Sequence, residues 1–288
     1  MIEMPLGIST LCTIGRTYSE MGRLLELGID VLEILEEYKD RLTPTRMRKV
    51  EELTESYDVR LTIHSPILDM NIASSTRAFR AESIRQVIRS VDNAALMGAE
   101  LVVVHPGVRT PLDFLYPGIH WGFNRESLRE ILNHAEASGV KVGVENMPGN
   151  HSFLLEKSSE FLELIGEGLP LQMTLDVGHA NTTSQLENYI RDMGNRIAHV
   201  HLHDNRGNDD EHLVVGKGTI DWGFLKRSLD MGSLTGVIEA NSLSDALQSI
   251  QGPVRSSARR KPDPLPPLPS GRTASPSQGG QPGPCSER

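Results

Sequence analysis

The sequence predicts an α/β protein in which residues 1–250 form one closed (β/α)8 barrel and residues 251–288 form a disordered C-terminal tail. Short apolar runs alternate with amphipathic stretches eight times before residue 250, which is typical of parallel strands joined by helices. The eight units average about 31 residues each, and about 250 residues is the usual size of such a barrel. An open doubly wound sheet would normally have a glycine-rich turn after its first strand, and residues 9–14 (STLCTI) contain no glycine.

The strands are predicted from short apolar runs that end in polar residues. In the third, fifth and seventh runs, aliphatic side chains alternate with other residues. The aliphatic side chains should therefore face the helices, and the residues between them should face the barrel interior. The predicted strands are 6–10, 31–36, 60–66, 101–107, 141–147, 171–179, 197–204 and 236–240.

The helices are predicted from amphipathic periodicity between these runs. Several of the patterns end close to a glycine, as a helix C-terminus often does; these glycines are Gly28, Gly98, Gly139 and Gly232. The predicted helices are 19–27, 44–57, 78–97, 125–138, 158–165, 185–193 and 222–231.

The composition changes abruptly after residue 250. Residues 251–288 contain nine prolines, six serines and five glycines, too little apolar surface to offset the entropy of ordering the chain. The PLPPLP run at 264–269 would suit an adaptor domain that binds proline-rich ligands, whereas a cloning or reading-frame artefact would leave the same composition. The tail is therefore predicted to be a disordered Pro/Ser/Gly-rich segment.

Charge and cysteine content limit the partners of the protein. The tail holds 6 of the 29 basic and 2 of the 38 acidic residues, which leaves a net charge of −13 for residues 1–250. Such an acidic body argues against a nucleic-acid partner. The two cysteines, Cys12 and Cys285, allow no disulfide framework. With neither a signal peptide nor an apolar run of membrane length, we expect a cytoplasmic protein without a membrane partner.

Six consecutive predicted strands, the third to the eighth, carry a side chain at or near the carboxyl end that can bind a metal. Active groups of a (β/α)8 barrel gather at that end, and imidazoles with carboxylates form sites for divalent metals. Taken singly, each residue could equally be a turn or capping residue, but chance would place polar groups at both ends of the strands. The six are His64, His105, Glu145, Asp176, His201 and Glu239.

The stretch from 197 to 222, IAHVHLHDNRGNDDEHLVVGKGTIDW, adds further candidates. His199, His201 and His203 share one face of the seventh strand, with His199 deeper and expected to be an interior hydrogen-bonded residue. Asp210 and His212 follow in the loop, and His179 comes three residues after Asp176. Of these, His179, His201, Asp210 and His212 are candidate metal ligands, because imidazoles and carboxylates that converge at a strand end and its loop predict a divalent metal site.

In this order, VVVHPG, VGVENMPG, LDVGH, HVHLHDNRGNDDEHLVVGKGTIDW and VIEAN resemble the motifs of the xylose-isomerase-like TIM-barrel superfamily. The resemblance covers residues 1–250 and none of the tail. That superfamily includes sugar and sugar-phosphate isomerases and epimerases, and also nucleases of the endonuclease IV type. The motifs are specific for the fold and the metal, and they leave the reaction open between these two branches.

The isomerase and epimerase branch implies one divalent ion, Mn²⁺, Mg²⁺, Co²⁺ or Zn²⁺, bound by Glu145, Asp176, His201 and Glu239. Such an ion would stabilise the enediolate of a small sugar or sugar phosphate. Glu145 and Glu239 would exchange the proton as acid and base, and His179 would contact a substrate oxygen. This reading is favoured because the body is acidic.

The nuclease branch implies three zinc ions. One would be bound by His64, His105 and Glu145, and a second by Glu145, Asp176, His201 and Glu239. The third would use His179, Asp210 and His212. All nine positions are filled here, although HLHD has His203 where the nuclease pattern has Asn. A metal-binding barrel without catalysis is a third reading, against which the complete set of ligands argues.

Overall fold

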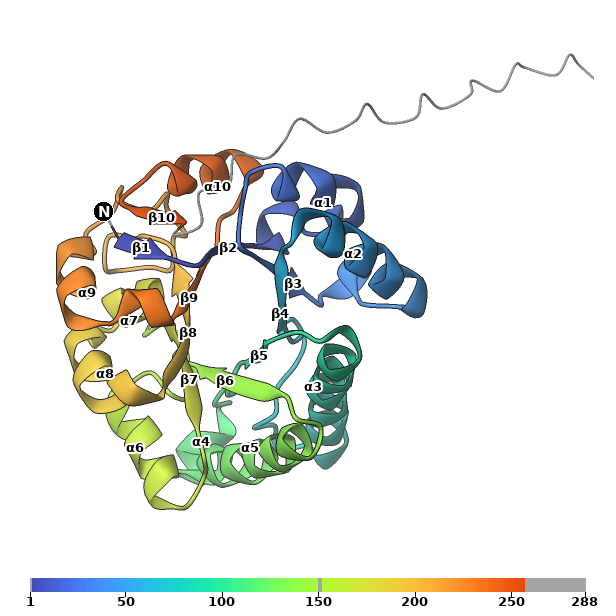
Figure 1. Ribbon diagram of the computed structural model, residues 1–288. Coiled ribbons are helices and arrows are strands. Elements are labelled where there is room, and N and C mark those ends of the chain that lie inside the picture. The colour runs from blue at the N-terminus through green and yellow to red at the C-terminus, as the bar shows by residue number, and fades with distance from the viewer. Residues whose placement is uncertain (1, 150–151, 257–288) are drawn as a thin grey trace, which may run out of the picture.

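Eight parallel strands close into a barrel in the computed structural model, which describes residues 2–149 and 152–256 (Figure 1). The strands follow one another in chain order around the barrel, and the last returns to pair with the first. The predicted (β/α)8 TIM barrel is therefore confirmed. Its strands are β2 (Leu6–Ser9), β3 (Val31–Leu35), β4 (Arg60–His64), β5 (Leu101–Val104), β6 (Lys141–Glu145), β7 (Gln172–Asp176), β8 (Ile197–Leu202) and β9 (Thr235–Ile238).

The helices form a ring around the barrel (Figure 1). All seven predicted helices are present, although the helix predicted at 125–138 begins earlier, at Ile119. Three further helices, α4, α7 and α10, were not predicted. The helices are α1 (Thr17–Leu25), α2 (Pro44–Tyr57), α3 (Arg77–Met97), α4 (Leu112–Leu115), α5 (Ile119–Ala137), α6 (Ser158–Gly166), α7 (Val177–Thr182), α8 (Leu186–Met193), α9 (Trp222–Ser228) and α10 (Leu243–Ile250).

Local sequence explains where several helices begin and end. The Thr43 hydroxyl accepts from the backbone N–H of Arg46 at the start of α2, and Pro44 occupies the first turn. Gly98, with φ of 63°, ends α3 in the left-handed conformation that glycine adopts at little cost. Gly232 does not end α9 as predicted, because α9 stops at Ser228 and Gly232 lies in a separate 3₁₀ turn.

The strand predicted at 171–179 is wrong at its carboxyl end. β7 stops at Asp176, and α7 begins at once. The Asp176 carboxylate accepts a hydrogen bond of 2.7 Å from the backbone N–H of His179, which caps the new helix. His179 therefore projects from a helix and not from a strand.

The alternation along the strands separates two buried sets of side chains. Outward residues such as Ile63, Val144 and Val200 pack with the helices in the main hydrophobic core. Inward residues such as Val103 and Val237 are equally buried but lie outside that cluster, within the barrel. The same inward parity carries Glu145 and His201 toward the barrel axis at its carboxyl end.

A second, two-stranded sheet joins the two ends of the described chain. β1 (Ile2–Met4) pairs in parallel with β10 (Val254–Ser256), and Figure 1 shows the pair beside the barrel. β10 lies beyond residue 250, in the segment assigned to the tail, while residues 257–288 lie outside the described residues. None of the described helices combines the length and apolarity needed to cross a membrane.

Candidate metal centre

The six strand-end residues lie at the same end of the barrel. His64, Glu145 and Asp176 are the last residues of β4, β6 and β7. His105 follows β5, Glu239 follows β9, and His201 lies one residue before the end of β8. All are buried except His105, whose side chain is 20% exposed. The topology thus brings together residues from six strands that are far apart in the chain.

Four of them form what we call the Glu145 group: Glu145, Asp176, His201 and Glu239. One donor atom from each lies within 4.8 Å of the others. Nδ1 of His201 lies 3.0 Å from Oε1 of Glu145, 3.6 Å from Oε2 of Glu239 and 3.8 Å from Oδ2 of Asp176. This is the set that the sequence predicted to bind a single divalent ion, and its role as a ligand set stays a prediction.

His64 and His105 approach the same carboxylate from the other side. Their Nε2 atoms lie 3.3 Å and 3.0 Å from Oε2 of Glu145. The two rings meet edge to face, with centroids 5.0 Å apart. Glu145 therefore stands between His201 on one oxygen and two further histidines on the other.

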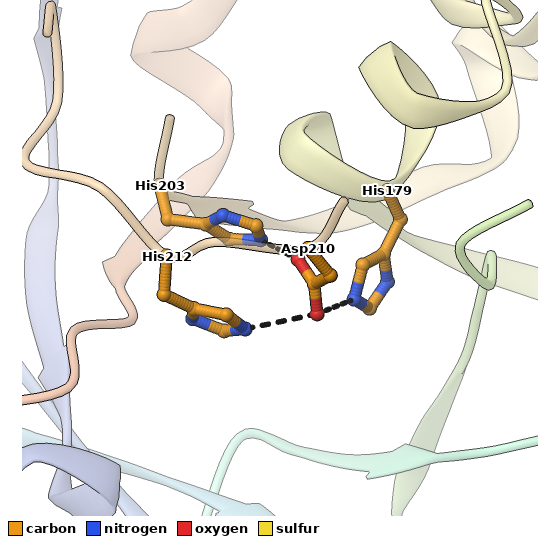
Figure 2. Close-up of side chains that lie close together, drawn as sticks. All are labelled: His179, His203, Asp210 and His212. Carbon is orange, nitrogen blue, oxygen red and sulfur yellow. Dashed lines mark hydrogen bonds and ion pairs between the residues drawn. The ribbon is translucent and has the colours of Figure 1, made fainter. Parts of the chain in front are cut away.

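The Asp210 group, formed by His179, His203, Asp210 and His212, lies beside the Glu145 group. Figure 2 shows the three imidazoles directed at the Asp210 carboxylate. Nε2 of His179 and Nε2 of His212 each lie 3.2 Å from Oδ2 of Asp210, and Nε2 of His203 lies 3.5 Å from Oδ1. The rings of His203 and His212 are stacked, with centroids 3.9 Å apart.

His203 connects the two groups. Its Nε2 also lies 3.0 Å from Oδ1 of Asp176, which belongs to the Glu145 group. The ring lies directly over Gly178, where a Cβ would come within 1.9 Å of Cε1 of His203. Only glycine fits at position 178 while His203 keeps this place.

The orientation of two histidines is that of metal ligands. Nδ1 of His64 lies 2.8 Å from the carbonyl oxygen of Ser65, and Nδ1 of His179 lies 2.8 Å from that of Asn146. A carbonyl only accepts, so both Nδ1 atoms donate, and the neutral rings direct an Nε2 lone pair at a carboxylate. Two such groups repel unless a proton or a cation lies between them. Metal-bound histidines characteristically have their outer N–H held in this way.

The electrostatics of the Glu145 group point in the same direction. Burial alone would raise the pKa of Glu145, but His201 and His105 beside it lower that pKa well below its ordinary value. Burial would lower the pKa of His201, but Glu239, Glu145 and Glu33 raise it well above its ordinary value. The carboxylates thus hold positive charge tightly in a buried site, which is what a divalent cation requires.

The pKa values in the Asp210 group are shifted in the same way. Against the effect of burial, Asp176 and Asp210 raise the pKa of His179 to about 10, and Asp210 raises the pKa of His212 to about 9. In addition, Oδ1 of Asp210 and Nδ1 of both His203 and His212 are buried and have no hydrogen-bond partner in the described part of the chain. The residues of both groups therefore fit a divalent cation by their chemistry.

Two residues of these clusters were not predicted from the sequence. His203 was predicted to share the face of His201 but was not proposed as a ligand. The His-x-His-x-His spacing of the strand could have indicated it. Glu33 was not singled out at all. It is fully buried in β3, and the signal was a lone carboxylate in the apolar run VLEIL.

Open space adjoins the buried clusters at His105. A recess of about 220 Å³ is lined by His105 and by residues of the loops after β4, β5 and β6. Most of these loop residues are apolar, among them Ile67, Met70, Val108 and Phe153. The recess gives a small molecule a way to approach the exposed edge of His105.

Comparison with known proteins identifies the family. An uncharacterised protein of Methanocaldococcus jannaschii is 32% identical over 257 residues, which cover 86% of this chain and 88% of that protein. Fructoselysine 3-epimerase of Shigella flexneri is 23% identical over 71% of this chain and 77% of its own.

Two solved structures show the same fold. A D-tagatose 3-epimerase-like protein superposes with a TM-score of 0.79 at 31% identity, covering 86% of this chain and 95% of the other. Endonuclease IV from Thermus thermophilus gives a TM-score of 0.64 at 21% identity, covering 86% and 96%. The sequence profile described as xylose isomerase-like TIM barrel matches residues 22–254. The chain belongs to the xylose isomerase-like TIM barrel family, as its motifs predicted.

Proposed function

We propose that this protein is a divalent-metal-dependent epimerase or isomerase of a sugar or sugar phosphate, with the Glu145 group as its centre. The observation that carries the proposal is the convergence of two glutamates, Glu145 and Glu239, on the same buried nitrogen of His201. The similarity to sugar epimerases supports the substrate class. When bound, the cation supplies positive charge beside the adjacent oxygens of a hydroxy-carbonyl sugar, where negative charge develops.

The chain's own residues then move the proton. Glu145 is ionised at neutral pH because the neighbouring histidines lower its pKa, so it can accept the proton of the carbon between the two oxygens. Glu239 returns a proton to that carbon. Delivery from the opposite face inverts the configuration, as in an epimerase. Nδ1 of His179 lies 3.5 Å from Oε1 of Glu145, so His179 is close enough to this centre to contact a substrate oxygen. Between turnovers the two carboxyls would exchange their protons with water, which resets Glu145 as the base and lets solvent deuterium reach the substrate carbon.

The test is exchange of a substrate C–H proton with D₂O, followed by NMR over a panel of ketoses and ketose phosphates with Mn²⁺-loaded protein. We expect exchange in the wild type and a loss of roughly 10²–10⁴-fold in Glu239→Gln, which keeps the size of the residue but removes the carboxyl that returns the proton. Glu100→Gln is the matched control, because Glu100 is exposed and pairs with Arg60 away from the site. Exchange that is absent across the panel, or equal in the two variants, would contradict the proposal.

The Asp210 group favours a second candidate, an endonuclease IV-like hydrolase with three zinc ions acting on abasic DNA. The net charge of −13 on residues 1–250 argues against it, since cleavage of DNA requires a surface that neutralises phosphates. Zinc analysis and an abasic duplex distinguish the two functions. The nuclease requires about three ions per chain and salt-sensitive nicking, whereas we expect no nicking.

A further inference from the structure

Three buried polar residues lie inside the barrel, deeper than the Glu145 group, and the proposed reaction does not use them. They are Glu33 of β3, Thr62 of β4 and His199 of β8, which are 0%, 1% and 1% exposed. An ionised carboxylate is costly to bury unless it is paired. The arrangement around Glu33 therefore indicates a specific task.

The two oxygens of Glu33 have different partners. Oε2 accepts a hydrogen bond of 3.1 Å from the Thr62 hydroxyl and lies 3.0 Å from Nε2 of His199. Oε1 lies 3.2 Å from Nε2 of His201. Both of these facing atoms are buried, and neither has a hydrogen-bond partner among the described residues, since the two lie within hydrogen-bond distance of each other but not at a hydrogen-bonding angle. A change of that angle would let Glu33 Oε1 receive the Nε2 hydrogen of His201.

Both nitrogens of His201 face carboxylates: Nδ1 makes a hydrogen bond of 3.0 Å with Oε1 of Glu145, and Nε2 faces Oε1 of Glu33. A cation bound at Nδ1 needs the lone pair of that atom, so the hydrogen of the neutral ring would then be on Nε2, with Glu33 as its acceptor. Nδ1 is the atom that faces the carboxylates of Glu145, Asp176 and Glu239. A carboxylate behind a histidine ligand fixes the ring and makes the ligand nitrogen more basic.

We propose that Glu33 is a positioning residue that holds His201 in the tautomer and orientation needed to bind the cation through Nδ1. Thr62 and His199 fix the Glu33 carboxylate in turn through its other oxygen. The proposal rests on the proposed function only in requiring that the Glu145 group binds a cation, and it requires no particular substrate.

A matched control lies three residues further along the chain. Glu36 is also buried, at 4% exposed, and follows β3. Its carboxylate accepts from the backbone N–H of Leu42 and from Nδ2 of Asn93, and it makes no contact with His201. Glu33→Gln and Glu36→Gln thus make the same substitution at two buried positions, and only the first removes the acceptor behind His201.

The first measurement is the affinity of the full-length metal-free protein for Zn²⁺ and Mn²⁺, determined by competition with a chelator. We expect a loss of about 10–100-fold in Glu33→Gln, the usual effect of removing such a partner, with little change in Glu36→Gln. Glu33→Asp should recover part of the affinity, because it keeps the carboxylate but is one methylene shorter. Equal affinity of Glu33→Gln and the wild type would overturn the proposal.

The second measurement uses the wild-type protein, so it tests the proposal even if Glu33→Gln does not fold. Imidazole ¹⁵N NMR of the zinc-loaded wild type, with His201 assigned through His201→Asn, should show a protonated Nε2 and a metal-bound Nδ1. A hydrogen on Nδ1, or zinc bound by Glu33, His199 and Nε2 of His201, would contradict the proposal. If affinity and tautomer behave as expected but no sugar exchanges its proton, the inference stands and the proposed reaction fails.

Discussion

Glu156 shows how burial without full hydrogen bonding makes a single residue sensitive to pH. One of its carboxylate oxygens is buried and has no hydrogen-bond partner within residues 2–149 and 152–256. Burial raises the pKa of Glu156 to about 7, although Arg109 nearby lowers it. A carboxyl whose pKa is higher in the folded than in the unfolded protein favours folding while it is protonated. That contribution is complete below the unfolded value near 4.5 and is lost as the pH rises through 7.

Glu156→Gln should therefore be more stable than the wild type at pH 8 and equally stable near pH 4, because the amide never ionises. Urea unfolding at the two pH values measures the difference in the free energy of unfolding. Glu163→Gln, at an exposed position of α6, controls for the loss of one negative charge. A gain at pH 4 that is as large as the gain at pH 8 would show that the pKa of Glu156 is not the cause.

The sequence predicted most of the residues of the site but not all of them. His64, Glu145 and Asp176 could be predicted because a barrel gathers the carboxyl ends of its strands, and each is the last residue of its strand. Glu33 could not be predicted by that rule, because it lies in the middle of β3 and reaches His201 only after closure of the barrel.

The loop between β8 and α9 shows how one buried residue orders a whole element. The carboxylate of Asp204 accepts four hydrogen bonds: from the backbone N–H groups of Asn205, Gly216 and Ile220, and from the indole of Trp222. Gly218 passes so close that a Cβ there would lie 2.2 Å from Oδ1 of Asp204. These contacts fold the loop that carries Asp210 and His212.

Asp204→Ala should destabilise the protein by roughly 3 kcal/mol, because it leaves buried donors without their charged acceptor. We also expect faster amide hydrogen exchange across residues 205–220, with the loop freed from the barrel. Asp221→Ala is the matched control: it removes the exposed N-cap of α9 and should cost only about 1 kcal/mol. Similar costs for the two variants, with unchanged exchange in the loop, would refute this role of Asp204.

Elements with strong periodicity were predicted, whereas elements that depend on tertiary contacts were not. The boundary of β7 was wrong because the helix after it is capped by Asp176, whose carboxylate was expected only as a ligand. α4 has four residues and shows too little pattern to be recognised. Neither case could be settled from apolar spacing alone.

On the scale of the whole molecule, the closed barrel was predictable because eight repeated units impose it, and the sheet that joins the chain ends was not. β1 and β10 lie at opposite ends of the described chain and have three residues each. Ile2, Met4 and Val254 are nevertheless buried, and the backbone N–H of Ile2 donates to the carbonyl of Pro253 at 2.8 Å. The ordered structure thus extends beyond the predicted end of the barrel at residue 250.

A chain that ends at Ile250 should therefore unfold at a lower temperature than a chain that ends at Ser256. The shorter chain loses the buried Val254, worth about 2 kcal/mol of apolar burial, and leaves β1 without its partner strand. For a domain of this size, such a loss should lower the Tm by about 4–8 °C. Calorimetry of the two chains measures the effect. Equal Tm values for the chains that end at Ile250 and Ser256 would show that β10 adds nothing to stability.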